Sequence, residues 1–240
     1  MKNKILEVTD LCKRYPDFYL DHIHFSLEKK KIIGLIGANG AGKSTILKLL
    51  LRIIDPDQGK IFFQGKDILV HKRMDYKRKI GYVGENIDFF SKCKLEKIKK
   101  FYQKFYPSWK ETDFNDMLNK MGLKLNYKMK DLSKGMKIKF NLCLALSHHP
   151  ALLLLDEPTA GLDPLVRNEI LKILREQVEE YGTSVIFSSH ITEDMEKISD
   201  ELLFLHQGNI IDACNTKDLI SQNVPIDVYL ENLINQMNRR

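Results

Sequence analysis

The fold is decided by the stretch Gly37-Ala38-Asn39-Gly40-Ala41-Gly42-Lys43-Ser44. It has the spacing G-x-x-x-x-G-K-[ST], follows an apolar run at 32–36 that predicts a strand, and precedes residues 45–54, which predict a helix. Glycines let backbone N–H groups surround an anion without Cβ clashes, and the helix directs the positive end of its dipole to the same place. The strand–loop–helix context favours a phosphate-binding loop over a chance glycine-rich turn.

Apolar runs elsewhere in the chain predict the sheet to which this loop belongs. Short strands are expected at residues 60–63, 80–83, 152–155, 184–187 and 202–205. Helices fill the gaps, including residues 164–180, where Pro164 suits a first helical turn. From about Cys93 to His149 the apolar residues recur with helical spacing, which predicts an inserted helical block. Because strands that alternate with helices form largely parallel sheets, the predicted class is α/β.

Two carboxylates, Asp156 and Glu157, follow the apolar run at 152–155. Charges at the tip of a buried strand are costly unless they serve a metal ion or a proton acceptor. We expect Asp156 and the Ser44 hydroxyl to hold Mg²⁺, Lys43 to contact the β- and γ-phosphates, and Glu157 to act as general base on the attacking water. The alternative is an ordinary strand end before the turn at Pro158.

The composition is that of an ordinary globular protein, with 43% hydrophobic and 29% charged residues and a net charge of +6 over 240 residues. This charge does not by itself argue for nucleic acid. No apolar stretch approaches the roughly 20 residues that cross a bilayer, and no signal-peptide core fits the first residues. We therefore expect a cytoplasmic protein, unless a partner holds it at a membrane.

The four cysteines are scattered, at Cys12, Cys93, Cys143 and Cys214. They form no CxxC pair, and no histidine lies near them at metal-ligand spacing. In a cytosolic chain this pattern favours reduced, buried or half-buried thiols over a metal site. We therefore expect no metal other than Mg²⁺.

Motifs downstream of the loop resemble those of the nucleotide-binding subunit of ABC transporters, over a span from about Leu6 to Gly208. Residues 132–136, LSKGM, are similar to the family's LSGGQ signature, and residues 156–163, DEPTAGLD, resemble its Walker B motif and D-loop almost letter for letter. His190, after two serines at a strand end, resembles the family's switch histidine. The order and spacing of these motifs carry the resemblance.

Two departures from the family pattern bear on its details. Lys134 and Met136 stand where the common signature has Gly and Gln, although Ser133 and Gly135 are retained. Glu85 stands where the family usually has the Q-loop glutamine. This combination resembles ABC-2-type exporter ATPases of Gram-positive bacteria, which include subunits that export antibiotics, lantibiotics or small amphipathic peptides.

The resemblance implies ATP and Mg²⁺ as cofactors, and roles for particular residues. Tyr15 would stack on adenine, Ser133 and Gly135 would cap the γ-phosphate of a second subunit, and Asp163 would couple two sites, whether or not it also caps a helix. The implied nucleotide-binding set is Tyr15, Gly37, Asn39, Gly40, Ala41, Gly42, Lys43, Ser44, Thr45, Ser133, Gly135 and Asp163. The implied catalytic set is Glu157, His190 and Glu85, and the Mg²⁺ set is Ser44, Asp156 and Glu85.

The resemblance also implies an architecture and partners. The chain would be a single ABC ATPase domain with a P-loop NTPase core of mostly parallel sheet, a small antiparallel β part at the N-terminus and an inserted helical subdomain. The core would span about 1–85 and 151–213, the helical subdomain about 86–150, and a short helical tail about 214–240. A second cassette would pair head to tail, and a membrane-spanning permease would hold the pair at the inner face of the cell membrane. No nucleic acid is expected.

Two segments leave alternatives open. The basic and aromatic run at 92–104 predicts an amphipathic helix with a solvated lysine face and an aromatic core face, rather than a lipid-headgroup or nucleic-acid contact. The apolar residues after Ile211 predict a short amphipathic helix on the core or on a second subunit.

Alternative functions also remain open. An importer ATPase and a soluble ABC ATPase that acts on ribosomes or DNA are alternatives to the exporter subunit. A degenerate cassette that binds ATP without hydrolysis is disfavoured, because Glu157 and His190 are both present.

Overall fold

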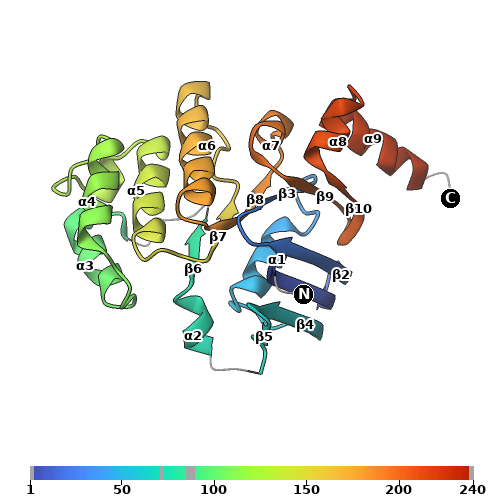
Figure 1. Ribbon diagram of the computed structural model, residues 1–240, viewed down its shortest axis with the longest axis horizontal. Coiled ribbons are helices and arrows are strands. Elements are labelled where there is room, and N and C mark those ends of the chain that lie inside the picture. The colour runs from blue at the N-terminus through green and yellow to red at the C-terminus, as the bar shows by residue number, and fades with distance from the viewer. Residues whose placement is uncertain (1–2, 71–72, 85–89, 238–240) are drawn as a thin grey trace.

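The computed structural model describes residues 3–70, 73–84 and 90–237 (Figure 1). The strands in these residues are β1 (Lys4–Tyr15), β2 (Phe18–Glu28), β3 (Ile32–Ile36), β4 (Gln58–Phe63), β5 (Lys66–Asp67), β6 (Ile80–Val83), β7 (Leu152–Asp156), β8 (Ser184–Ser189), β9 (Glu201–His206) and β10 (Asn209–Asn215). The helices are α1 (Lys43–Leu50), α2 (Arg73–Lys77), α3 (Leu95–Gln103), α4 (Glu111–Lys120), the 3₁₀ turn η2 (Met129–Asp131), α5 (Lys134–Leu146), α6 (Pro164–Glu179), α7 (Thr192–Ile198), α8 (Thr216–Ser221) and α9 (Ile226–Met237).

The strands form two sheets. One is antiparallel, with the order β2-β1-β4-β5, and the other has the order β10-β9-β3-β8-β7-β6. In the second sheet the pairs from β9 to β6 are parallel, and only β10 runs antiparallel to its neighbour β9. The predicted α/β class, with a mostly parallel sheet and a small antiparallel part at the N-terminus, is confirmed.

Strand β7 shows how the second sheet is buried on both faces. Leu152 and Leu154 belong to a core cluster with α1 and the antiparallel sheet, whereas Leu153 and Leu155 belong to a second cluster with α5 and α6. Because successive side chains of a strand point to opposite faces, a strand covered on both sides reads as the continuous apolar run seen in the sequence. Helix α1 thus packs between the two sheets, which fixes the loop before it at the carboxyl ends of β3, β7 and β8.

The inserted helices lie at one end of the molecule. Figure 1 shows α3, α4 and α5 grouped beyond β6, at the end opposite to α8 and α9. Their core joins the mixed sheet through Phe114 and Phe140, which are both fully buried in the cluster that includes Leu153. The helical block is therefore continuous with one face of the sheet.

Two element boundaries differ from the predictions. Helix α1 ends at Leu50 rather than at residue 54, because Arg52 adopts a left-handed φ of +49° and its guanidinium donates to the Ile68 carbonyl at 2.6 Å. The segment after Ile211 begins as strand, since Ala213 and Cys214 pair with β9. The predicted amphipathic helix is α9, where Tyr229 packs on Phe204 at 5.3 Å between ring centroids and so covers the core.

The prediction for helix α3 is wrong in part. Leu95 and Ile98 are buried as expected, but Phe101 and Phe105 are 47% and 48% exposed. Lys99 is buried instead, where it pairs with Glu111 at the start of α4. Lysine carries a long apolar stem, so one ion pair allows it to occupy the inner face. An aromatic surface therefore remains uncovered on this helix.

Candidate nucleotide-binding site

The loop before α1 has the backbone that an anion site requires. Gly40 and Gly42 have φ of +81° and +113°, which L side chains rarely adopt. A Cβ on Gly37 would lie 2.5 Å from the Leu205 carbonyl oxygen, so this glycine is needed for close packing. Gly42 begins α1 without a side-chain cap, and the first N–H groups of the helix remain available to an anion.

The other residues of the loop have ordinary packing roles. Asn39 is exposed at the tip, Ala41 is buried, and Thr45 is half-buried in the first turn of α1. The Ala41 carbonyl accepts from the Gly208 N–H at 3.1 Å, which ties the loop to the end of β9. Within the loop, the Ala41 N–H donates to the Ala38 carbonyl at 3.1 Å, and these two contacts hold the loop shape.

Lys43 lies beneath the loop and is 5% exposed. Its Nζ donates to the carbonyl oxygens of Gly37 at 2.6 Å and Ala38 at 3.3 Å. It also lies 3.2 Å from Glu157 Oε1, which makes an ion pair between the loop and the end of β7. The ammonium is thus held between the loop backbone and the carboxylate that follows β7.

Asp156, at the end of β7, accepts hydrogen bonds on one oxygen from two hydroxyl groups. Ser44 Oγ donates to Asp156 Oδ1 at 3.0 Å, and Ser188 Oγ donates to the same atom at 2.9 Å. A hydroxyl and a carboxylate in contact are the hard oxygen donors that Mg²⁺ prefers. The sequence predicts that Ser44 and Asp156 bind Mg²⁺ together, and this contact is consistent with that prediction.

Glu157 and His190 lie together, as catalytic partners would. His190 Nδ1 is 2.8 Å from Glu157 Oε2, while Glu157 Oε1 accepts no hydrogen bond from the described residues. Glu157 has a φ of +51°, a strained conformation for a residue with a side chain, and it sits directly after the last strand residue. In this conformation Glu157 Oε1 lies 3.2 Å from Lys43 Nζ.

Ser188 is a positioning residue that the sequence interpretation missed. It is fully buried, it donates to Asp156, and its Oγ accepts from the Glu157 N–H at 3.1 Å. Its register partner on the neighbouring strand is Asp156. The available signal was a serine at the end of an apolar strand parallel to the strand that carries the acids.

Tyr82 adds an aromatic residue near the acids. It lies on β6, which pairs with β7, and burial, followed by the charge of Asp156, raises the pKa of its hydroxyl to about 12. The phenol therefore stays neutral at all ordinary pH values. Glu85, which follows β6 and was predicted to contribute to catalysis and to Mg²⁺ binding, lies outside the described residues.

Tyr15 lies near the loop, with Phe18 between the two. It ends β1, is 37% exposed, and its ring centroid lies 6.4 Å from that of Phe18. Phe18 in turn contacts Gly42, where an added Cβ would lie 3.0 Å from its ring. An exposed aromatic ring beside the loop is suited to stacking on a base.

The remaining predicted residues lie on the helical side. Ser133 caps α5 by accepting from the Met136 N–H at 3.3 Å, and Asp163 caps α6 by accepting from Leu165 and Val166. Gly135 packs on Val166, where a Cβ would lie 3.0 Å from a methyl group. Within the described part of the chain, Ser133, Gly135 and Asp163 take no part in the contacts of the acids and Lys43.

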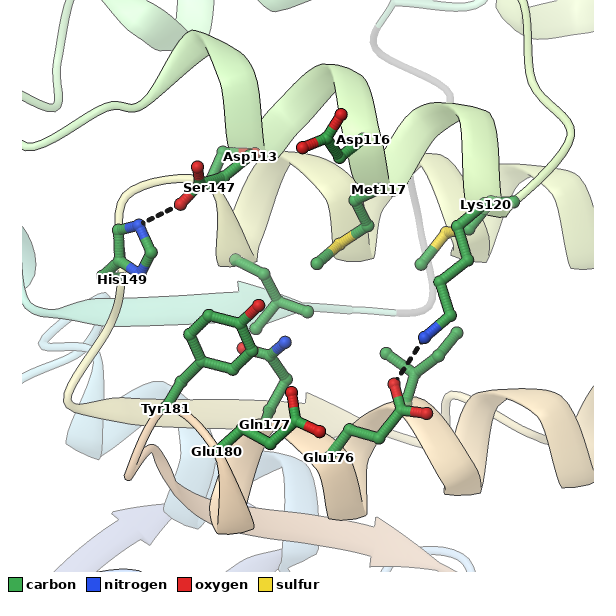
Figure 2. A pocket seen from close by; sticks show the side chains of 13 residues that line it. Asp113, Asp116, Met117, Lys120, Ser147, His149, Glu176, Gln177, Glu180 and Tyr181 are labelled. Atoms are coloured by element: carbon green, nitrogen blue, oxygen red, sulfur yellow. Dashed lines mark hydrogen bonds and ion pairs between the residues drawn. The ribbon is translucent and has the colours of Figure 1, made fainter.

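A cavity of about 240 Å³ lies between α4, the end of α5 and α6, and none of the predicted site residues lines it (Figure 2). Two ion pairs border it, Lys120 Nζ to Glu176 Oε2 at 2.6 Å and His149 Nε2 to Asp113 Oδ2 at 2.7 Å. The Thr112 hydroxyl first, and then His149, hold the pKa of Asp113 below its usual value. The first pair connects α4 to α6, outside the inserted block, whereas the second lies within the block.

Comparison with known proteins gives the family. The family described as ABC transporter matches residues 20–160, and the chain therefore belongs to it. It is the ATP-binding subunit, an ABC transporter ATPase. Within the described residues, none of the helices is long and apolar enough to span a bilayer.

Individual relatives agree with this assignment. The chain is 31% identical to the ABC transporter ATP-binding protein YtrB of Bacillus subtilis, over 90% of this chain and 73% of that protein. It is 30% identical to the bacitracin transport ATP-binding protein BcrA of Bacillus licheniformis, over 98% of this chain and 76% of that protein. A solved structure of an ATP-binding subunit of an ABC transporter superposes with a TM-score of 0.84 at 28% identity, covering 95% of this chain and 98% of that one.

Proposed function

We propose that this subunit binds MgATP at residues 37–45, hydrolyses it in a head-to-tail pair of cassettes, and drives export of a peptide, antibiotic or other amphipathic substrate through a separate membrane subunit. The observation that carries the proposal is the meeting of Lys43, Ser44, Asp156, Glu157 and His190 at one edge of the sheet. Lys43 and Ser44 begin α1, Asp156 ends β7, and Glu157 and His190 directly follow β7 and β8. Together they provide a cation, oxygen ligands and a candidate base in contact.

The donor set fits the cofactor. The uncapped start of α1 and the Lys43 ammonium would hold phosphate charge, and Ser44 with Asp156 would hold Mg²⁺. MgATP supplies the phosphoanhydride bond whose cleavage drives the cycle. The acceptor for the proton of the attacking water would be Glu157 Oε1, whose partner among the described residues is the Lys43 ammonium at 3.2 Å, while His190 holds the other oxygen. Ser188 would keep both acids in place.

The site of one chain is incomplete, which is the reason to propose a pair. Ser133 and Gly135 lie at the start of α5 and pack on the α6 side instead of on the loop before α1. A second cassette, the same chain or a homologous one, would bring its own signature residues to the γ-phosphate. Asp163, exposed at the start of α6, would then lie between the two sites while it caps its helix.

The permease would dock on the helical side and place the subunit at the cytoplasmic face of the membrane. Phe101 on α3 and Phe105 just after it meet edge to face with ring centroids 5.0 Å apart, and the Phe90 ring centroid lies 5.4 Å from that of Phe101. An exposed aromatic cluster of this kind is typical of protein interfaces. Export of an antibiotic or peptide is supported by the similarity to BcrA, whose name states bacitracin transport.

We further propose that the chain is one ABC ATPase domain. A core at about 1–85 and 151–213 would be interrupted by a helical subdomain at about 86–150, within which α3, α4 and α5 lie. Strand β10 crosses the proposed start of the tail at 214, so the sheet extends to Asn215 and the tail proper would consist of α8 and α9.

The test is MgATP-dependent dimerisation of Glu157→Gln, measured by light scattering. Removing the base while keeping the side-chain shape should trap the pair, so the variant should be monomeric without nucleotide and dimeric with MgATP. The matched control, Glu157→Gln with Lys43→Ala, should remain monomeric because it loses the phosphate contact. A Glu157→Gln variant that binds ATP but stays monomeric would exclude the self-pairing cassette and assign the second signature to another chain.

A further inference from the structure

Side chains with metal-binding atoms meet on the antiparallel sheet. Strands β1 and β2 pair with register shifts on both sides of the Leu11–Ile23 pair. Asp10 and His22 flank this irregularity with left-handed φ of +55° and +43°. Bulges re-aim side chains that regular strands would place apart. Here the bulge brings Cys12 of β1 beside Asp21 and His22 of β2.

The spacing of these side chains suits a tetrahedral ion. In the part of the chain that the structure describes, ligand atoms of Cys12, Asp21 and His22 lie within 4.8 Å of one another. His22 Nε2 is 3.6 Å from Asp21 Oδ1. Ligand bonds of about 2.0 to 2.3 Å in a tetrahedral zinc site place neighbouring ligand atoms about 3.3 to 3.6 Å apart. The separation of Asp21 Oδ1 and His22 Nε2 thus already matches this spacing, and binding one ion would draw the three ligand atoms, now within 4.8 Å of one another, to about the same separation.

A second carboxylate orients the histidine. Asp10 Oδ1 pairs with His22 Nδ1, which leaves Nε2 facing Asp21. Asp10 is itself held, because its N–H donates to His24 Nδ1 at 3.1 Å. A histidine that binds a metal almost always donates its other ring N–H to a carboxylate or carbonyl. This arrangement of carboxylate, imidazole and a free ring nitrogen is present before any ion binds.

The Cys12 sulfur would be the third ligand. Cys12 is 1% exposed, and its Sγ accepts from the His22 N–H at 3.3 Å. The Sγ also donates to the Asp10 carbonyl at 3.6 Å, and this proton would leave on metal binding, because the thiolate is the form that binds metals. Sulfur with imidazole and carboxylate selects Zn²⁺ over Mg²⁺, which prefers oxygen alone.

We propose that Cys12, Asp21 and His22 form a zinc site that joins β1 to β2, with solvent as the fourth ligand and Asp10 as the positioning residue for His22. Zinc binding releases the thiol proton and requires a neutral imidazole. The site is independent of the proposed transport function. It departs from the expectation, based on sequence spacing, that no metal other than Mg²⁺ binds.

The test is zinc titration of the metal-stripped full chain against a chromophoric chelator. Wild type should take up one equivalent of Zn²⁺, and Co²⁺ should produce a thiolate charge-transfer band in the near ultraviolet. Asp10→Asn should weaken zinc binding about 10- to 100-fold. His22→Gln and Asp21→Asn, which change surface residues, should weaken it at least as much, and Cys12→Ser should abolish the cobalt band.

The controls separate this site from others. Cys93→Ser and His149→Gln replace a thiol and an imidazole elsewhere and should leave binding unchanged. Zinc binding that is lost in His190→Gln but kept in His22→Gln would place the ion at the nucleotide site and overturn the proposal. Absence of stoichiometric binding by wild type would also overturn it. If Cys12→Ser fails to fold, the variants of the exposed His22 and the half-buried Asp21 still test the proposal.

Discussion

Substitution of Ser188 by alanine tests whether a buried hydroxyl positions both acids of the nucleotide site. Ser188 Oγ donates to Asp156 Oδ1 at 2.9 Å and accepts from the Glu157 N–H at 3.1 Å. The first bond ends on a carboxylate, and such bonds contribute about 1.5–3 kcal/mol. Loss of the second hydrogen bond, from the Glu157 N–H, is partly compensated, because this N–H also donates to the Ser188 carbonyl at 3.1 Å. We therefore expect Ser188→Ala to lower the free energy of unfolding by about 2 kcal/mol.

The effect on hydrolysis should exceed what this loss of stability explains. An Asp156 that has lost one of its two hydroxyl donors would hold Mg²⁺ less firmly, and outer contacts of this kind are worth about 10- to 100-fold. We expect a fall of that size in the rate of ATP hydrolysis, which corresponds to about 1.4–2.7 kcal/mol in the barrier. The affinity for ATP should change less, since Lys43 and the loop glycines are untouched.

Ser184 provides the matched control on the same strand. It is also fully buried, and its Oγ accepts a single hydrogen bond, from the Lys30 N–H at 3.0 Å, at the opposite end of β8. Ser184→Ala should cost about 1 kcal/mol in stability and leave hydrolysis within about twofold of wild type. Urea unfolding and a coupled ATPase assay, with Mg²⁺ varied, measure both quantities. Equal hydrolysis rates for the two variants would refute a positioning role for Ser188.

Three further predictions follow from other contacts. Burial lowers the pKa of His148 from 6.5 to about 4, so between these pH values the unfolded chain binds a proton that the folded chain does not. The free energy of unfolding should therefore fall by about 3 kcal/mol as pH drops through this window. His148→Leu should remove this pH dependence in urea unfolding measured at several pH values. Arg167 pairs with the fully buried Asp194 at 2.6 Å; Arg167→Met alone should cost about 3–5 kcal/mol by thermal or urea unfolding, and adding Asp194→Leu should restore much of it. Phe101→Ser with Phe105→Ser removes two half-buried rings and should lower the unfolding free energy by about 1–3 kcal/mol, and it should reduce co-purification of the folded variant with the permease. Unchanged co-purification would contradict docking there.

Much of the parallel sheet could be predicted because its signals are local. A strand buried on both faces must be apolar throughout, so Leu152–Leu155 and Ile32–Ile36 are visible as runs. Helix α6 begins as expected, because Asp163 caps it and Pro164 occupies its first position. In the antiparallel sheet, β4 was predicted at residues 60–63, but β1 and β2 gave no such signal, since the bulges of β1 break the alternation of apolar and polar residues. That part of the fold was implied by the family resemblance alone.

The candidate site, like the fold, was predictable from the sequence only in part. The sequence by itself determined the phosphate-binding loop and the acids after β7, because backbone freedom at glycine and the cost of a buried charge are properties of single positions. Only the tertiary structure decided that Lys43 meets Glu157, that Ser188 joins the two acids, and that Cys12 meets His22. These residues are distant in sequence or displaced by a bulge. Their contacts depend on strand order and register, which arise from the packing of the whole chain and not from any local pattern.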